Sequence, residues 1–372
     1  MLQMQSRVSS SGQVSLGLVE VDVPALAPGD VLIRIEATPI NPSDLGVMLA
    51  GADASTIEGA TIDGRPTITA TVPPASLRGL SGRIGQSLPC GNEGAGVVVA
   101  AGSDPQAQAL VGKTVAALGG AMYSEFRAMP AVHCLVLHDG TTAVEAASCF
   151  VNPLTALAMV DTMRSDGHSA IVHTAAASNL GQMLVKICQA EQVGLVNIVR
   201  RPAQADLLRS LGAQHVCDSS QDSFNDDLVA ALVATKATVA FDATGGGRLA
   251  NQILIAMEAA ASKDPSAPYS RYGSTIHKQV YIYGGLDRST TELTRSYGMA
   301  WGVGGFLLPN FLAKVGAERG QQLRQRVADE LTTTFSSNYT KQVSLRNALN
   351  PAEAAVYARQ ATGEKYLITP HS

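Results

Sequence analysis

The sequence predicts an α/β protein in which a β-rich domain is joined to a doubly wound parallel sheet. Short β runs broken by Gly and Pro fill residues 14–120, and apolar runs alternate with helical stretches across residues 151–309. A chain of 372 residues with 46% hydrophobic content is long for one core, so we expect two domains. We place them at 1–150 and 151–315, with residues 316–372 returning to the first domain.

The β-rich part is predicted from alternating or apolar runs bounded by turn residues, at 15–21, 30–37, 93–100 and 112–118. Two stretches look like insertions instead. Residues 52–88 are rich in Thr, Gly and Pro, and residues 262–276 contain Ser, Pro and two tyrosines.

The second part is predicted from apolar runs at 169–174, 195–200, 214–217, 238–243 and 278–283, each separated by a helical stretch. A helix over 205–211 ends at Gly212, a typical helix-terminating glycine. A later helix carries Leu249, Ile253 and Met257 on one face. A charged amphipathic stretch at 316–332 then leads to a final strand at 364–369.

The segment 171–190 combines an apolar run, a turn of small residues and an amphipathic helix. Together with the next apolar run it predicts a βαβ unit that directs a helix N-terminus at a dinucleotide pyrophosphate. Laid on the pattern G-x-G-x-x-G, residues 176–181 keep only the third glycine, and small residues occupy the first and second glycine positions. The predicted cofactor loop contains Ala176, Ser178, Asn179, Leu180 and Gly181.

Ser178 or Asn179 is expected to cap the helix that follows. From these residues alone, a βα unit of another α/β fold explains the segment equally well.

Arg200 and Arg201 stand where the second strand of this unit ends. A ribose bound to such a unit reaches that strand tip, where an acidic side chain would accept hydrogen bonds from a free 2′-hydroxyl and an arginine would pair with a 2′-phosphate. No Asp or Glu lies beside Arg200. The pair therefore predicts NADP(H) and not NAD(H), although an ordinary solvated turn before Pro202 is the alternative.

Composition narrows the function classes. The net charge of −4 and pI near 6.0 offer no basic surface, so nucleic acid is not expected as a partner. The N-terminus lacks the apolar core of a signal peptide, and no apolar run approaches the roughly 18 residues of a membrane span. The five cysteines are scattered without a C-x-x-C pair. We expect a soluble cytoplasmic protein with reduced thiols and no membrane partner.

Several short motifs occur in a characteristic order along nearly the whole chain: DVLIRI (30–35), NPSD (41–44), GNEGAGVV (91–98), GGAMYSEF (119–126), VNPLTA (151–156), the cofactor loop, FDATGG (241–246) and GEKY (363–366). In this order the chain resembles the medium-chain dehydrogenase/reductase superfamily, and specifically its zinc-free branch of NADPH:quinone oxidoreductases and mitochondrial-type enoyl reductases. The resemblance implies a GroES-like β-rich catalytic domain and a Rossmann cofactor domain.

Zinc-dependent members of this superfamily carry a Cys in the segment that matches 41–46 and a His before Glu in the segment that matches 91–94. Here the first segment has no Cys and Asn92 precedes Glu93, and an amide is a poor zinc ligand. The four closely spaced cysteines of a structural zinc lobe are also missing from the sequence. The resemblance therefore implies no metal, and a conjugated acceptor that can spread the charge left by hydride addition.

The resemblance also assigns candidate site residues. Asn41 and Thr155 would lie near the nicotinamide, and Tyr123 is the candidate proton donor or orienting hydroxyl. Cofactor contacts would also come from Thr244, Gly245, Gly246, Gly284 and Lys365. Simpler explanations remain for the first three: a turn residue before Pro42, a helix cap after Pro153, and a tyrosine packed between strands.

The expected function is zinc-independent, NADPH-dependent hydride transfer to a quinone or an α,β-unsaturated carbonyl. The small-molecule acceptor would be electrophilic. Enoyl thioester reduction is an alternative hypothesis. It is weakened because the enoyl reductases have a catalytic tyrosine in this region, and residues 45–58 contain no Tyr. An NADPH-binding protein with little catalysis and an alcohol dehydrogenase with unusual zinc ligands are also open. A homodimer is expected through the cofactor domains, with the apolar segment 300–308 as its edge.

Overall fold

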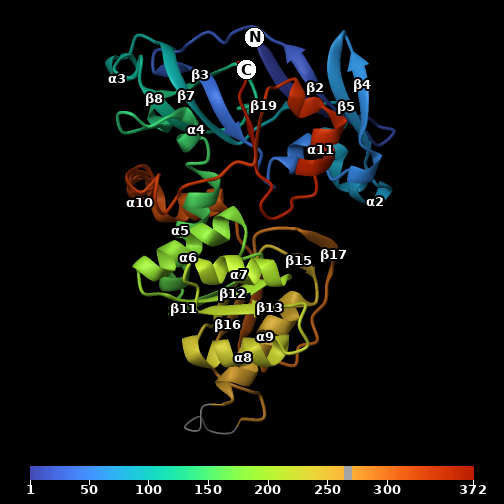
Figure 1. The fold of residues 1–372 in the computed structure, drawn as a ribbon, viewed down its shortest axis with the longest axis vertical. Helices are drawn as coiled ribbons and strands as arrows, with labels where there is room; N and C mark the ends of the chain where they lie inside the picture. Colours follow the sequence, from blue (N-terminus) through green and yellow to red (C-terminus); the bar gives the residue numbers. More distant parts are fainter. Residues whose placement is uncertain (264–269) are drawn as a thin grey trace. The chain divides into compact units, whose positions relative to one another are not determined.

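The computed structural model describes residues 1–263 and 270–372. The chain forms two compact units, one of residues 1–151 and 324–372 and the other of residues 152–323 (Figure 1). Both contain sheets and helices, so the predicted α/β fold class is confirmed. None of the helices in the described part is long and apolar enough to cross a membrane.

The first unit is built around two sheets. One has the strand order β4-β5-β2-β1-β6, and the other has the order β10-β8-β7-β3-β20-β19, with β9 also paired to β3. The strands are β1 (Leu2–Val8), β2 (Gln13–Glu20), β3 (Asp30–Pro39), β4 (Glu58–Ile62), β5 (Arg65–Thr71), β6 (Ser87–Pro89), β7 (Glu93–Ala101), β8 (Thr114–Leu118), β9 (Phe126–Pro130), β10 (Cys134–Val136), β19 (Lys341–Val343) and β20 (Tyr366–Ile368). The helices of this unit are short: α1 (Leu45–Met48), α2 (Pro74–Leu77), α3 (Pro105–Gln108), α4 (Ala143–Ala146) and α11 (Pro351–Tyr357).

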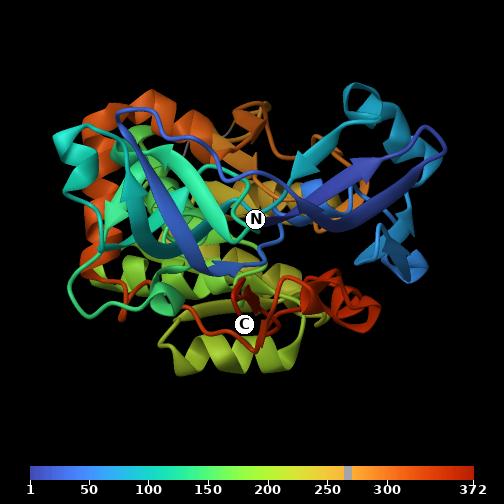
Figure 2. The same cartoon turned by 90° about the horizontal axis from the view of Figure 1, so that it is seen from above.

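The alternation of buried and less buried side chains along β1 explains why this segment forms a strand of the first sheet. In β1 the side chains of Met4, Ser6 and Val8 are buried while their neighbours are not, as in a strand with one face on the core. Its antiparallel partner β2 forms a long hairpin with it, dark blue in Figure 2. Residues 52–88 do not form an irregular insertion, because β4 and β5 extend this sheet beyond β2. The C-terminal strand β20 pairs antiparallel with β3.

The second unit carries a parallel sheet in the order β13-β12-β11-β14-β16-β18. This is the doubly wound order in which the chain starts in the middle and reverses direction between β11 and β14. Its strands are β11 (Ala170–His173), β12 (Gly194–Val199), β13 (His215–Asp218), β14 (Val239–Asp242), β16 (Lys278–Ile282) and β18 (Trp301–Gly305), and β15 (Gly245–Gly247) pairs with β17 (Asp287–Thr291) separately. All five predicted runs are strands, and β18 adds the edge of the sheet.

The helices associated with this unit are α5 (Val151–Ser165), α6 (Asn179–Ala190), α7 (Pro202–Ser210), α8 (Phe224–Thr235), α9 (Leu249–Ala261) and α10 (Leu308–Asp329). One core lies between the sheet and the apolar faces of α8 and α9. Gly212, with φ of +85°, follows α7 as predicted. Within the expected insertion at 262–276, residues 264–269 lie outside the described residues.

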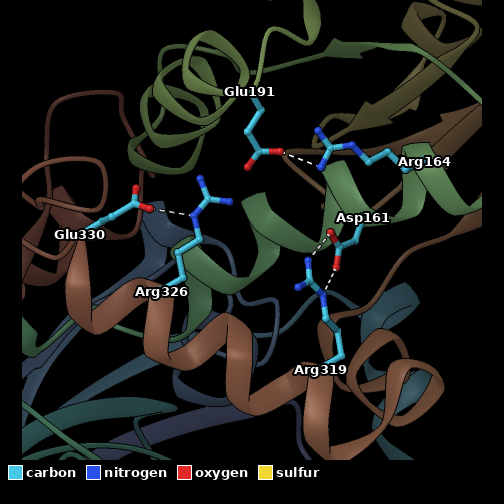
Figure 3. A network of polar contacts seen from close by, with 6 residues as sticks. All are labelled: Asp161, Arg164, Glu191, Arg319, Arg326 and Glu330. Carbon is cyan, nitrogen blue, oxygen red and sulfur yellow. Dashed lines mark hydrogen bonds and ion pairs between the residues drawn. The ribbon is translucent and has the colours of Figure 1, made fainter.

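Helix α10 begins earlier than the predicted stretch at 316–332 and is kinked at Gly316, which has φ of +81°. After the kink, Arg319 donates from Nε and an Nη atom to the two carboxylate oxygens of Asp161 on α5, at 2.8 and 2.9 Å (Figure 3). Further along the helix, Arg326 pairs with Glu330 at 2.8 Å. The bidentate pair fixes the start of the second half of α10 against α5.

Candidate functional site

The predicted cofactor loop lies between β11 and α6, at the carboxyl end of the parallel sheet. Ser178 is the N-cap of α6, and its hydroxyl oxygen accepts a hydrogen bond from the backbone N–H of Gly181 at 3.1 Å. Asn179 is the first helical residue and does not cap the helix. The first turn of α6 thus presents backbone N–H groups at the place where the strand order reverses, a typical site for a pyrophosphate.

Glycine is required at position 181 because the backbone of α6 lies very close to the backbone of Ala176. A Cβ atom at this position would lie 2.0 Å from the carbonyl oxygen of Ala176, so only glycine lets the helix pack on the loop. The first two pattern positions do not need glycine for their backbone conformation, since Ser178 has φ of −64° and Ala176 is not a positive-φ residue. The positive φ of the loop, +50°, falls on Ala175 instead.

The two arginines lie at the tip of β12. Both side chains are exposed, and Arg201 is the residue that precedes α7. The backbone N–H of Arg200 donates to the side-chain oxygen of Gln204 at 3.2 Å. Asp218 ends the neighbouring strand opposite Val199, but its carboxylate accepts hydrogen bonds from the backbone and hydroxyl of Ser220. The strand tip therefore offers guanidinium groups to an anion.

Asp242 organises the loop after β14 and was not among the predicted site residues. Its carboxylate accepts hydrogen bonds from the hydroxyl of Thr174 at 2.7 Å and from the backbone N–H groups of Thr244 and Gly245 at 2.8 and 3.1 Å. Gly284 packs closely here, because a Cβ atom on it would lie 2.5 Å from the carbonyl oxygen of Ala243. Asp242 thereby joins the loop that follows β11 to the loop that follows β14.

A second group of polar residues is buried in the first unit, around Glu93 at the start of β7. The side-chain Nδ2 of Asn41 donates to Glu93 Oε1 at 2.7 Å, and the backbone N–H groups of Phe150 and Val151 donate to Oε2 at 2.8 and 2.9 Å. The Glu93 side chain is fully buried. Asp44 lies in the same group, where its two oxygens accept from the backbone N–H groups of Asn41 and Asn92.

Burial changes the pKa of three ionisable residues around Glu93. It raises the pKa of Asp44 to about 7, a shift increased by the nearby charge of Glu93. It also raises the pKa of Glu93, an effect opposed by Lys365 and by the three N–H donors. Burial lowers the pKa of Lys365 to about 8, against the attraction of Glu93 and Asp44. Lys365 donates to the hydroxyl of Ser148 at 2.7 Å, so it belongs to this cluster in the first unit.

The remaining candidates have defined surroundings. Tyr123 is fully buried, and its hydroxyl donates to the carbonyl oxygen of Pro39 at 2.9 Å. Burial raises the pKa of Tyr123 well above its ordinary value. Thr155 lies inside α5, so the interpretation of Thr155 as a helix cap is wrong. Within residues 1–263 and 270–372, no three His, Cys, Asp or Glu side chains are grouped to hold a metal.

The structure therefore brings Asn41 and Lys365 together around Glu93 in one unit, and residues 176–181, 244–246 and 284 together at the switch point of the other. Their roles toward a ligand stay predictions. Asp44, Glu93 and Asp242 were missed as site residues. Each of these three acids lies inside one of the short motifs: Asp44 in NPSD, Glu93 in GNEGAGVV and Asp242 in FDATGG. Their position inside a motif is the feature of the sequence that could have identified them as site residues.

Comparisons with known proteins agree with this architecture. No family model matches the chain. A solved structure from Mesorhizobium loti, assigned as an NADPH:quinone reductase, matches with a TM-score of 0.72 and 26% identity over 99% of this chain and 98% of that one. The mitochondrial enoyl-[acyl-carrier-protein] reductase of Mus musculus is 29% identical over 205 residues, 54% of this chain and 48% of that protein. The resemblance to the medium-chain dehydrogenase/reductase superfamily is confirmed.

A further relative is the synaptic vesicle membrane protein VAT-1 homolog of Rattus norvegicus, which is 24% identical over 207 residues, 55% of this chain and 44% of that protein. The chain thus spans about half the length of these two curated relatives. The match to the Mesorhizobium loti structure, in contrast, extends over both units, so the superfamily fold applies to the β-rich unit as well as to the parallel sheet.

Proposed function

We propose that this protein is an oxidoreductase that transfers hydride from NADPH to a quinone or an α,β-unsaturated carbonyl without a metal. The observation that carries the proposal is the α6 N-terminus at the switch point of the sheet together with Arg200 and Arg201 at the adjacent strand tip. The similarity to a structure assigned as an NADPH:quinone reductase supports it.

The residues present fit NADPH. The close contact of Gly181 with Ala176 keeps α6 against the loop, and the first N–H groups of the helix would bind the pyrophosphate. Arg200 and Arg201 would hold the 2′-phosphate. The carboxylate of Asp242 accepts hydrogen bonds from the backbone N–H groups of Thr244 and Gly245 and so keeps the loop after β14 in place.

When bound, the nicotinamide supplies the hydride. The chain's task is to orient the acceptor, exclude water and stabilise the charge that develops on the acceptor oxygen. Buried Asn41 is the candidate for orienting the nicotinamide end. Lys365 is half-buried in the same cluster as Glu93, and its lowered pKa of about 8 makes its ammonium a stronger acid than that of an exposed lysine, which suits proton donation near neutral pH.

The proposal is tested by following the loss of NADPH absorbance with a panel of quinones and enones, with and without a chelator. A saturated ketone serves as the control acceptor. Turnover of the conjugated acceptors alone, unaffected by the chelator, is expected. Tight NADPH binding with no turnover of any acceptor would favour the alternative hypothesis, an NADPH-binding protein with little catalysis.

An enoyl thioester belongs in the same panel because of the similarity to the mouse enoyl-[acyl-carrier-protein] reductase. Preference for the thioester over the quinones would replace the proposed acceptor class but not the proposed cofactor.

We further propose that the protein acts in the cytoplasm as a homodimer joined along β18. This strand is at the edge of the parallel sheet, and Met299 and Leu307 on either side of it are exposed. Light scattering coupled to size exclusion tests the dimer, and a monomer at micromolar concentration would refute it.

A further inference from the structure

His173 and Tyr283 form a polar pair at the carboxyl end of the parallel sheet, and both belong to the unit of residues 152–323. His173 is the last residue of β11, and Tyr283 directly follows β16. The ring atom Nε2 of His173 lies 2.7 Å from the hydroxyl oxygen of Tyr283. Because β14 is the strand between β11 and β16, this hydrogen bond spans the point at which the strand order reverses.

The two side chains of the pair differ in exposure. His173 is fully buried, whereas Tyr283 is partly exposed. Their ring planes are inclined by only 16°, with the ring centroids 5.8 Å apart. The Tyr283 hydroxyl therefore points inward to the histidine, and a ligand at this end of the sheet would meet the ring of Tyr283 and not its hydroxyl.

Both members of the pair are neutral, and their surroundings set the direction of the hydrogen bond. Burial lowers the pKa of His173 to about 3 and raises the pKa of Tyr283 far above its ordinary value. Asn197 on β12 is the register partner of His173, and its Nδ2 donates to the carbonyl oxygen of His215 at 3.2 Å.

The proton of the neutral imidazole is assigned from what remains. In the described part of the chain, the buried atoms His173 Nδ1 and Asn197 Oδ1 have no hydrogen-bond partner. An amide oxygen only accepts, so it favours the imidazole form with its proton on Nδ1. Nε2 is then an acceptor, and Tyr283 donates to it. This donation increases the electron density of the phenol ring.

Tyr283 and the arginine pair are on opposite sides of the switch point. Arg200 and Arg201 follow β12, and Tyr283 follows β16. A dinucleotide bound across a doubly wound sheet places its two halves on opposite sides of that point. With the 2′-phosphate of the adenosine half held after β12, the nicotinamide half extends toward the ends of β14 and β16.

We propose that the ring of Tyr283 contacts the nicotinamide ring and binds its oxidised, positively charged form more tightly than its reduced, neutral form. An aromatic face attracts a cation through its quadrupole, whereas a neutral ring gains only the stacking contact. His173 is the positioning residue that holds the phenol ring in place. The inference rests on the cofactor site of the proposed function and gives that site a preference between two redox states. A Tyr283 that only packed the strand end would affect both forms equally.

The test compares the dissociation constants of NADP⁺ and NADPH, measured by titration calorimetry. Tyr283→Leu is expected to raise the constant for NADP⁺ about tenfold and that for NADPH at most about threefold. His173→Leu, which removes the acceptor of the phenol, is expected to raise both by about threefold. His173→Gln supplies an amide oxygen as acceptor and is expected to bind within about twofold of the wild type. Tyr272→Leu, at a tyrosine of the same unit that is 58% exposed, is the matched control.

Each result supports or overturns one part of the inference. Equal losses for the two redox forms in Tyr283→Leu, or binding as tight as that of Tyr272→Leu, would overturn the ring contact. Losses in His173→Gln as large as those in His173→Leu would overturn the positioning role. If Tyr283→Leu does not fold, NMR of the wild type with ring-¹³C tyrosine decides, with Tyr283→Phe identifying the signal. A Tyr283 signal that shifts when NADP⁺ binds supports the contact, and one that stays unchanged overturns it.

Failure of the proposed function has a different signature. No binding of either nucleotide by the wild type would refute the proposed function and this inference together. The expected difference between NADP⁺ and NADPH without turnover of any acceptor would refute the proposed reaction alone and leave the role of Tyr283 intact.

Discussion

Gly181→Ala gives the sharpest test of the cofactor loop, because two effects of known sign oppose each other. In the interior of a helix, Ala is favoured over Gly by up to about 1 kcal/mol. At this position the new Cβ would lie 2.0 Å from the carbonyl oxygen of Ala176, 2.6 Å from its carbonyl carbon and 2.9 Å from its Cα. Ordinary contact begins at 3.4 Å. The atoms in the way are backbone, so no side chain can rotate aside.

Helix α6 and the loop must therefore separate by more than about 1 Å where they now touch. That separation strains the hydrogen bond from the Gly181 N–H to the Ser178 hydroxyl, an N-cap contact worth about 1 kcal/mol. Overpacking of a rigid contact adds about 1–3 kcal/mol. After the gain of up to about 1 kcal/mol from helix propensity is subtracted, we expect Gly181→Ala to lower the free energy of unfolding by about 2 kcal/mol and to weaken NADPH binding at least tenfold.

Urea unfolding and an NADPH titration followed by Trp301 fluorescence measure the two effects. Gly320→Ala in α10 is the control in the same unit, because a Cβ atom there would make only an ordinary contact with Leu312, at 3.8 Å. A variant Gly181→Ala as stable as Gly320→Ala would show that the loop does not press on α6, and the argument from close approach would be refuted.

Three other substitutions test the charges. Arg200→Ala is expected to raise the KM for NADPH by about ten- to a hundredfold with little change for NADH, since only NADPH carries the 2′-phosphate; equal effects on both would refute this assignment. The pKa of Asp44 is raised to about 7, so the folded protein holds a proton that the unfolded chain loses near pH 4. Denaturation across this range should show stability falling as pH rises from about 4 to 7, by at most about 4 kcal/mol, and Asp44→Asn should flatten the profile; a parallel profile would contradict the shift. Asp161→Asn breaks the bridge to Arg319 in Figure 3, but Arg319 is 43% exposed, so calorimetry should show a loss below about 1 kcal/mol.

The parallel sheet could be predicted because its strands are buried on both faces. Burial on both faces makes each strand a continuous apolar run, which a sequence shows directly. The antiparallel sheet of the first unit was predicted less completely. In β5 the buried Ile68 and Ala70 alternate with threonines, and the strand contains Pro66, so the run from Arg65 to Thr71 resembled a loop. A strand of this kind is defined by its partner β2, which lies some 50 positions earlier in the chain.

The parts of the site that could be predicted are those whose interacting residues are close together in the sequence. The helix cap at Ser178 and the arginines after β12 lie within or beside the elements that position them. Asp242 and Glu93 were missed because their partners are distant in sequence: Thr174 is 68 residues from Asp242, and Phe150 is 57 residues from Glu93. A buried acid becomes a fixed acceptor only when folding brings donors to it, and no spacing rule in the sequence describes that event.

The incomplete glycine pattern shows how a motif can lose residues and keep its geometry. A glycine in such a pattern meets one of three needs: a positive φ, room for a ligand, or close packing of helix on strand. Here the third need is absolute at Gly181. The positive φ has moved to Ala175, where an alanine costs about 1–2 kcal/mol. That strain is offset by local hydrogen bonds, since the Ser178 N–H donates to the Ala175 carbonyl at 2.9 Å and the Ala176 N–H donates to the carbonyl of Ile198 at 3.2 Å. The conformation of the loop is thus maintained by its backbone hydrogen bonds and by one glycine. The number of glycines alone therefore underestimates how well the segment matches a dinucleotide-binding loop.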